Sequence, residues 1–220
     1  MPLKGLNLDL WFMQCQNPAC QLRFPLDLEQ YQGSFCPLCG SRLNRSQKAL
    51  DPGAPEHARQ DSRFALEGLL DNIRSALNVG AVFRAADGAG LRKLWLGGIT
   101  PAPTRQTQIA KTALGAEQAV PWESAPNALT LAADLKAQGY TLLALENAPN
   151  SRPLFSYRPE SSSQNPMLLI VGSEQAGVDP GLLALADETL CLPMSGSKGS
   201  LNVAVAFGIA AYWLRFAPPL

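Results

Sequence analysis

The sequence predicts an α/β domain with a mainly parallel sheet, preceded by a small cysteine-rich module. Four of the five cysteines fall within residues 1–46, where no helical period is visible. From about residue 61, short apolar runs alternate with stretches of helical pattern. This alternation is typical of parallel sheets whose strands are joined by helices. Residues 47–60 contain two prolines and a glycine, and we expect them to link the module to the domain of residues 61–220.

The expected strands of the domain are short apolar runs bounded by polar residues, glycine or proline. They are Arg92–Ile99, Tyr140–Leu145, Met167–Val171 and Thr189–Met194. The expected helices are Val79–Gly90, Asn127–Gln138, Pro180–Ala186 and a long stretch after Ser200. Asn78 and Ser200 have the side chains that cap helices, and we expect them to cap the first and the last helix.

Composition excludes some classes of protein and leaves others open. The chain has 220 residues, of which 46% are hydrophobic and 16% charged, with a formal net charge of zero. This composition supports a real core and argues against binding nucleic acid by bulk charge. Residues 59–111 nevertheless carry eight Lys/Arg and four Asp/Glu, so a local polyanion site is compatible with the sequence.

The termini indicate no export and no membrane span. Met1–Leu10 lacks the long apolar run of a secretory signal, and Leu201–Phe216 is short for a span and contains Asn202 and Arg215. We therefore expect a cytoplasmic protein with reduced cysteines.

The cysteine spacing predicts a zinc site. Cys15 and Cys20 are separated by four residues, and Cys36 and Cys39 by two. Two such thiolate pairs can close a tetrahedron around zinc, and a set of four cysteines leaves no open position for chemistry. A structural zinc ribbon over residues 1–46 is therefore expected, with a redox Cys-x-x-Cys pair as the alternative. Cys191 lies far away in an apolar run and is expected to be an inert core residue.

Three segments of the larger domain contain polar residues and glycines that a plain helix or turn does not require. The first is Asn78-Val-Gly80 followed by Arg84 on a largely apolar helix, where a guanidinium needs a partner or an anion. The second is Gly172-Ser-Glu174-Gln-Ala-Gly177 directly after a buried strand, where α/β sheets bind ligands. The third is the small-residue loop of residues 193–199, which leads into Ser200 and Asn202. Each segment alone is also explained by a surface arginine, a tight turn or a helix cap.

Together the three segments resemble the SpoU/TrmH family of RNA ribose methyltransferases, within the SPOUT superfamily. Asn78, Gly80 and Arg84 match its N-x-G-x-x-x-R motif, and residues 172–177 match its G-x-E-x-x-G turn. Residues 193–206 match its P-M-x-G-x-x-x-S-L-N-V-x-V-A signature, and the resemblance covers about residues 61–216. Ala85 departs from the family pattern, where a threonine commonly follows the arginine. The cysteine module is not a general feature of the family, so it leaves the identity of the substrate open.

The resemblance implies a trefoil knot, a homodimer with the site near its interface, and a methyl donor, S-adenosylmethionine, bound in the knot. The substrate implied is a ribose 2′-OH of tRNA or rRNA. The implied catalytic residues are Arg84, Asn78, Ser200 and Asn202. The implied donor-binding residues are Val171, Gly172, Ser173, Glu174, Gly177, Leu192, Met194, Gly196, Ser200, Leu201 and Asn202.

Arg84 has the key role in the implied mechanism, either as a general base or as a fixed cation that stabilises the developing alkoxide. Arginine barely deprotonates in proteins, which favours the second role. Two alternatives to the whole assignment stay open: a catalytically inactive RNA-binding protein of the same fold, and a SPOUT enzyme that methylates an RNA base. A dinucleotide-binding enzyme is disfavoured, because the sequence lacks the glycine-rich turn with an acidic residue about 20 positions later. Whether the ribbon binds RNA through Arg23, Arg42, Arg45 and Lys48 or only stabilises the fold also stays open.

Overall fold

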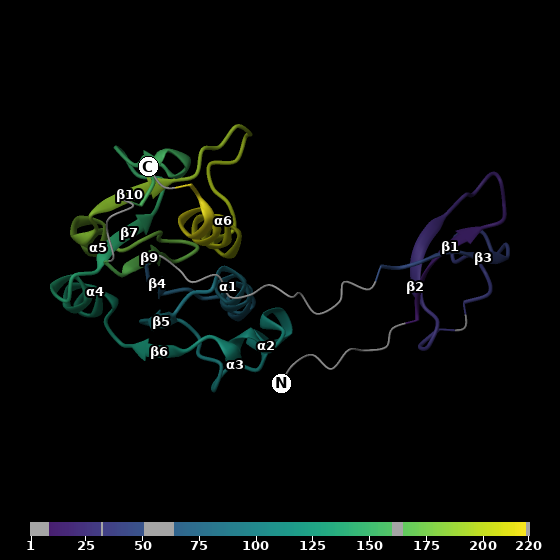
Figure 1. Cartoon of the computed structure of the whole chain (residues 1–220), viewed down its shortest axis with the longest axis horizontal. Helices are drawn as coiled ribbons and strands as arrows, with labels where there is room; N and C mark the ends of the chain where they lie inside the picture. The colour runs from purple at the N-terminus through teal and green to yellow at the C-terminus, as the bar shows by residue number, and fades with distance from the viewer. Residues whose placement is uncertain (1–8, 32, 51–63, 160–164, 219–220) are drawn as a thin grey trace. The chain divides into compact units, whose positions relative to one another are not determined.

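The computed structural model describes residues 9–31, 33–50, 64–159 and 165–218. The chain divides into two compact units, Met1–Ala58 and Arg59–Leu220, each of which is described by itself (Figure 1). We call them the ribbon and the larger unit. The ribbon's last strand extends to Lys48, two residues into the expected linker at 47–60. Residues 51–60 of that linker lie outside the described residues.

The ribbon is a three-stranded antiparallel sheet of order β2-β1-β3. Its strands are β1 (Leu10–Cys15), β2 (Arg23–Asp27) and β3 (Leu43–Lys48). The first cysteine pair lies at the end of β1 and in the turn that follows, and the second pair lies in the loop before β3. Asn17 forms the first turn, since its carbonyl accepts from the Cys20 N–H and its side chain from the Ala19 N–H. Gly40 closes the second turn with a φ of 72°.

The larger unit contains a seven-stranded parallel sheet of order β6-β5-β4-β9-β7-β10-β8, which confirms the predicted α/β fold with a mainly parallel sheet. The strands are β4 (Leu66–Asp71), β5 (Lys93–Gly97), β6 (Trp122–Ala125), β7 (Thr141–Leu145), β8 (Arg152–Pro153), β9 (Met167–Val171) and β10 (Glu188–Cys191). The four expected strands correspond to β5, β7, β9 and β10. β5 and β10 end earlier than expected, because the chain turns into loops after Gly97 and Cys191.

Helices cover both faces of this sheet (Figure 1). One face packs against α1 (Ala76–Ala89), α2 (Gln108–Ala113), α3 (Ala116–Ala119), the short 3₁₀ turn η1 (Leu154–Ser156) and α6 (Val203–Phe216). The other face packs against α4 (Ala128–Ala137) and α5 (Pro180–Leu185). The expected helices correspond to α1, α4, α5 and α6, and the sequence pattern did not reveal α2, α3 or η1. The trefoil knot stays a prediction. No helix in the described parts of the chain is long and apolar enough to cross a membrane.

The strand β4 was not predicted, although every residue in it is buried and it lies inside the sheet. Glu67, Gly68 and Asp71 interrupt its apolar pattern. Gly68 is required by close approach, because a Cβ there would lie 2.7 Å from the Leu94 side chain. β4 was therefore not recognised as a strand, because polar residues and a glycine interrupt the apolar run by which buried strands are predicted.

Glu67 is tolerated in the core because its carboxylate is paired. The indole N–H of Trp95 donates to Oε2 at 2.8 Å, and the Tyr140 hydroxyl donates to Oε1 at 3.1 Å. Arg92 lies 4.0 Å from the same carboxylate. A buried charge of this kind is strongly destabilising when a partner is removed.

The two predicted caps are wrong by a few residues. Helix α1 begins at Ala76, and Ser75 caps it by accepting from the Asn78 N–H, so Asn78 lies inside the first turn. Helix α6 begins at Val203, and its cap is Asn202, which accepts from the N–H groups of Ala204 and Val205. In each case another side chain of the capping type stood a few positions away, and periodicity could not choose between them.

The pairing of Glu67 predicts the effect of a conservative change. Trp95→Phe keeps an aromatic ring but removes the N–H, and we expect a loss of about 1.5–3 kcal/mol in the free energy of unfolding. Urea denaturation followed by circular dichroism measures it. The matched control is Trp122→Phe, because the Trp122 side chain is half-buried and makes no hydrogen bond with any described residue. Equal losses in the two variants would contradict a role for the indole N–H.

Candidate active site and metal centre

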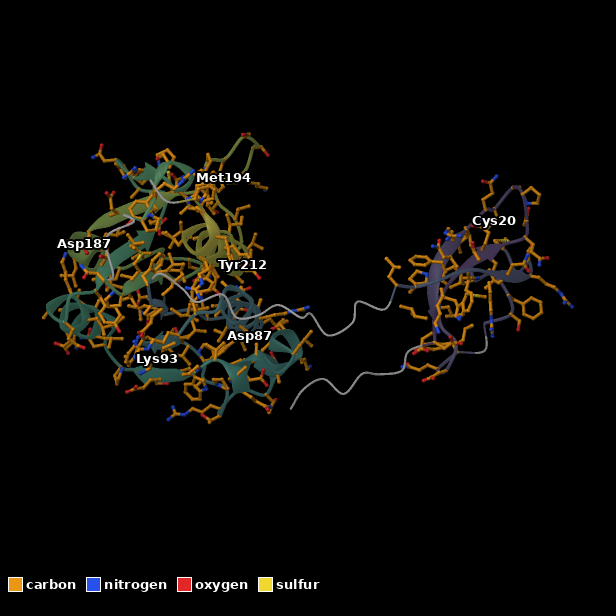
Figure 2. All side chains as sticks on the ribbon, viewed as in Figure 1. Cys20, Asp87, Lys93, Asp187, Met194 and Tyr212 are labelled. Carbon is orange, nitrogen blue, oxygen red and sulfur yellow. The ribbon has the colours of Figure 1, made fainter. Side chains whose placement is uncertain are left out.

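A cavity of about 380 Å³ lies where the carboxyl ends of β7, β9 and β10 meet the start of α6. Ligands bind in this position in open α/β sheets, because the loops that follow the strands converge there. Most of the expected donor-binding residues line it, including Met194 on the loop after β10 (Figure 2). The expected residues in its lining are Val171, Gly172, Ser173, Glu174, Gly177, Leu192, Met194, Ser200, Leu201 and Asn202. Gly196 and Arg84 are not among the lining residues.

The turn after β9 is closed on itself. Ser173 and Gly177 exchange two backbone hydrogen bonds, with N···O distances of 3.0 and 2.9 Å. Gly177 has a φ of 73°, and a Cβ there would lie 2.5 Å from a carboxylate oxygen of Glu146. The glycine spacing of this motif therefore reflects a tight turn pressed against a neighbouring loop.

The Glu174 side chain leaves this turn and binds the amino end of α1. Oε2 accepts from the Arg74 N–H at 2.9 Å, and Oε1 accepts from the Ser75 N–H at 3.1 Å and from the Asn78 amide at 2.8 Å. Partial burial acts to raise the pKa of Glu174, but these hydrogen bonds outweigh it and the pKa lies below its usual value. A carboxylate at a helix amino terminus is also favoured by the helix dipole.

Asn78 and Asn202 extend this contact to the third motif. The Asn202 amide donates to Oδ1 of Asn78 at 3.0 Å, while Oδ1 of Asn202 caps α6. A continuous chain of hydrogen bonds thus runs from Glu174 through Asn78 to Asn202 and joins the three motifs. We call it the motif bridge. It explains why Asn78 does not cap its helix, since both ends of its side chain are in use.

Arg84 lies apart from the cavity. Its side chain is exposed on α1 and makes no hydrogen bond or ion pair with any described residue. Around it, α1 and the adjacent α6 expose large apolar side chains: Leu77, Val205, Tyr212 and Phe216 are 46%, 52%, 46% and 53% exposed. Ser200, at the cavity, is exposed and likewise makes no hydrogen bond among the described residues.

Glu146 is a cavity residue that sequence reasoning missed. It follows β7 directly, and its carboxylate accepts from the Val178 N–H at 2.9 Å and from the Asn147 N–H at 2.9 Å. Asn147 in turn donates to the Gly199 carbonyl at 3.3 Å, so the loop after β7 is joined to the loops after β9 and β10. The sequence feature that could have indicated Glu146 is its position directly after a predicted strand, where α/β sheets bind ligands.

Cys191 and five other residues also line the cavity without having been predicted. Cys191 is half-buried, and its Sγ lies 3.9 Å from the Ser151 carbonyl, so the expectation of an inert core residue is wrong. The remaining unpredicted lining residues are Leu145, Asn147, Gly199, Val203 and Ala206.

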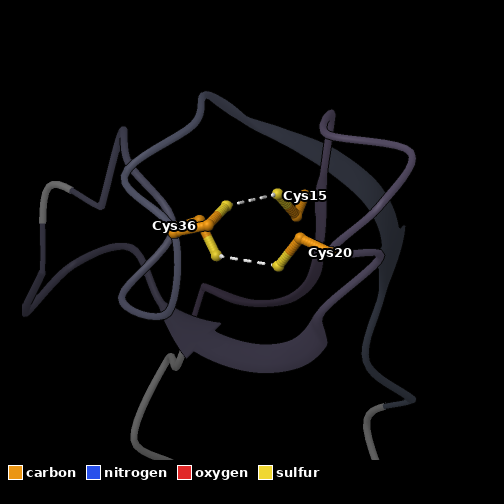
Figure 3. A group of neighbouring side chains, drawn as sticks. Cys15, Cys20 and Cys36 are labelled. Carbon is orange, nitrogen blue, oxygen red and sulfur yellow. Dashed lines mark hydrogen bonds between the residues drawn. The ribbon is translucent and has the colours of Figure 1, made fainter.

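The four ribbon cysteines are brought together as the spacing predicts. Their Sγ atoms all lie within 4.8 Å of one another, with 3.5 Å between Cys15 and Cys39 and 3.7 Å between Cys20 and Cys36. Figure 3 shows Cys15, Cys20 and Cys36 converging from the surrounding loops. Tetrahedral zinc with Zn–S bonds of about 2.3 Å needs sulfur atoms about 3.8 Å apart. The cluster can therefore hold zinc, and the convergence of all four thiols favours a metal over a redox pair.

Local hydrogen bonds help this cluster to bind a cation. The Ser41 side chain and then the Ser41 backbone lower the pKa of the Cys39 thiol to about 6. The Asn17 N–H also points to the Cys15 sulfur at 3.4 Å, although burial is the larger effect there and raises the pKa of the Cys15 thiol to about 12. Both interactions favour the thiolate, which is the form that binds zinc.

Known proteins resemble the larger unit in sequence and in fold. The model of the SpoU rRNA Methylase family matches residues 67–212. The 23S rRNA (guanosine(2553)-2′-O)-methyltransferase RlmP of Bacillus subtilis is 36% identical over 163 residues, which are 73% of this chain and 61% of that protein. The tRNA (guanosine(18)-2′-O)-methyltransferase of Escherichia coli is 30% identical over 146 residues, which are 65% of this chain and 59% of that protein.

A solved structure supports the same relationship. The AdoMet-bound rRNA methyltransferase of Sinorhizobium meliloti superposes with a TM-score of 0.61 at 28% identity, over 67% of this chain and 54% of that one. The matched stretch thus spans less than two thirds of the length of each of these relatives. The family match covers β4 to α6, with all three motifs and the cavity, and the chain belongs to the SpoU rRNA methylase family.

Proposed function

We propose that the chain is an S-adenosylmethionine-dependent methyltransferase that acts on a ribose 2′-OH of tRNA or rRNA. The observation that carries the proposal is the cavity at the carboxyl ends of β7, β9 and β10, which is lined by the second and third motifs. Membership of the family and the activities for which the relatives are named support it. With RNA of these classes as the substrate, the reaction belongs in the cytoplasm.

The cavity is proposed to hold the methyl donor. Its volume lies within the range of about 300–1,000 Å³ that small-molecule sites occupy. The loops offer backbone groups at Val171 to Gly177 and at Leu192 to Met194, and the aliphatic side chains of Leu145 and Leu201 offer apolar surface. Gly196, which is outside the lining, is proposed to act only through the length and flexibility of its loop.

Methyl transfer is an in-line displacement in which the ribose oxygen bonds to the methyl carbon as the carbon–sulfur bond breaks. The donor supplies an already activated methyl group, so the protein must align the oxygen and stabilise it as its proton leaves. The Arg84 guanidinium is proposed to stabilise the developing alkoxide or hold the adjacent phosphate. The motif bridge holds Asn78 and Asn202 in fixed orientations, and Ser200 is free to orient the ribose.

A homodimer is proposed to complete this site. Arg84 is absent from the lining of the cavity in its own chain, and it is surrounded by exposed apolar side chains of α1 and α6. An apolar surface of this kind is typical of a protein interface. A second copy that covers this surface would bury the apolar side chains and place Arg84 beside one of the two donor cavities of the dimer.

Methylation assays with Arg84 variants test the function. Purified protein is incubated with methyl-labelled S-adenosylmethionine and bulk tRNA or rRNA, and the RNA is digested to nucleosides. We expect a 2′-O-methylated nucleoside, and we expect Arg84→Lys to lower kcat about 10²–10³-fold, because lysine lacks the planar fork. Donor binding should persist in that variant.

The control for this assay is Arg105→Lys, since Arg105 is also exposed and its side chain makes no hydrogen bond or ion pair with any described residue. A label found on a base would support base methylation instead. Donor binding without transfer to either RNA class by the wild type would support the inactive RNA-binding protein.

The motif bridge predicts a pH-dependent contribution from Glu174. Glu174→Gln places an amide donor against a backbone N–H, and we expect weaker donor binding and lower stability near pH 7. Because the folded-state pKa of Glu174 is depressed, its contribution is present above the unfolded value of about 4.3 and disappears as pH falls through the lower folded value. Melting temperatures from pH 3 to 7, with and without donor, measure this.

The control for the Glu174 experiment is Gln175→Ala, which removes only the hydrogen bond to the Arg74 side chain. A difference between Glu174→Gln and wild type that is constant with pH would refute the assigned charge.

The cysteine cluster is proposed to hold a structural zinc. We expect about one zinc per chain by elemental analysis, and Cys39→Ser should lose it, because a set of three thiolates binds zinc less tightly. Cys191→Ser is the matched control and should retain the metal. Freshly purified wild-type protein without zinc would disprove the proposal.

A further inference from the structure

The ribbon sheet has one face that packs toward the cysteine cluster and one face that carries amides, arginines and two exposed phenylalanine rings. Met13 and Cys15 are buried on the first face, toward the cysteine cluster. Side chains alternate between the two faces along a strand, and paired residues in antiparallel strands share a face. Phe12 and Gln14 therefore lie on the opposite face, which we call the outer face.

The strand register extends the outer face over all three strands. Gln14 is paired with Arg23 of β2 and with Asn44 of β3, and Phe12 is paired with Gln47. Alternation along the chain from Asn44 adds Arg42, whose antiparallel bridge partner is Phe35.

Aromatic rings and guanidinium groups on the outer face are accessible. Phe35 is 62% exposed and Phe12 is 37% exposed. The Arg23 guanidinium lies 5.4 Å from the centroid of the Phe12 ring and donates to the Ser46 hydroxyl at 2.5 Å. Exposed rings beside arginines provide flat surfaces on which unpaired bases stack.

Amide side chains provide hydrogen-bonding groups between the rings. The Gln14 amide donates to the Gln21 carbonyl at 2.9 Å. The amide of Gln16, the first residue after β1, donates to the Asn44 side chain. Each amide has both donor and acceptor atoms, and the edges of bases offer matching groups. Among the described residues of the three strands, the carboxylate in register with this face is that of Asp27, which pairs with Leu10 and is buried. The exposed part of the face therefore carries the positive charge of Arg23 and Arg42.

We propose that the outer face of the ribbon binds single-stranded RNA, and thereby captures an unpaired loop or end of the substrate. Rings cannot stack on bases that are paired within a duplex, which is why the geometry selects unpaired RNA. The inference rests on the proposed activity on RNA and deepens it by naming the substrate class. It also gives the neutral chain a local site, since its net charge cannot supply RNA affinity.

The test uses the full-length protein and a fluorescein-labelled single-stranded oligoribonucleotide of about ten nucleotides, within the length that one such sheet binds. Anisotropy titrations compare wild type, Phe35→Ala and Arg42→Gln. Phe35→Ala should weaken binding about tenfold, as the loss of one stacked base does. Arg42→Gln should reduce the slope of log K against log salt by about 0.7.

The matched control is Tyr31→Ala, because Tyr31 is an aromatic residue of the ribbon that is 60% exposed and lies after β2, outside the paired residues that define the outer face. It should leave affinity and slope close to wild type, and all variants should retain their zinc. In the methylation assay, Phe35→Ala should raise KM for RNA and leave kcat unchanged, since Phe35 belongs to the ribbon and is not among the residues that line the donor cavity.

Wild-type affinity and KM in both variants would overturn the inference, as would equal binding of a duplex of the same sequence. Those results would indicate that the outer face contacts protein or solvent and does not bind single-stranded RNA. If the variants lose single-strand binding while the wild type transfers no methyl group to RNA, the ribbon assignment stands and the proposed enzymatic activity fails.

Discussion

The contact between the Glu174 carboxylate and the amino end of α1 is the constraint on which the rest of the candidate site depends. It joins the turn after β9 to the first motif, and through Asn78 it reaches the cap of α6. It thereby brings three motifs that lie far apart in the sequence into one hydrogen-bonded network. Because the donors to Glu174 include two backbone N–H groups, the contact depends on the start of α1 at Ala76 and on the cap at Ser75.

Much of the fold follows from the sequence because the strands β7 and β9 are uninterrupted apolar runs, and the glycines near them mark turns. The strand β4 shows the limit of that reasoning. Glu67 can be buried in β4 only because Trp95 in β5 and Tyr140, just before β7, donate hydrogen bonds to its carboxylate. These partners are distant in the sequence, so no local sequence pattern reveals the pairing. The cap positions failed for a related reason, since Asn78 is recruited by residues about a hundred positions away.

The candidate site was predicted unevenly for similar physical reasons. Cysteine spacing predicts a cluster because two closely spaced pairs of thiols in short turns are typical of zinc sites. The turns at Asn17 and Gly40 have the expected geometry. Motif residues that border glycines were found, because tight turns impose them. Glu146 was not found, because its role is to bind the backbone of another loop, and a single acidic residue after a strand is a common occurrence.

The separation of the chain into two units has a consequence for its cooperativity. The ribbon buries only a few side chains around its cysteines, whereas the larger unit has extensive cores on both faces of a seven-stranded sheet. A small metal module gains most of its folding free energy from the ion, so its stability follows the free zinc concentration. We therefore expect heating to produce two transitions governed by different variables, so that each melting temperature describes one unit and not the whole chain.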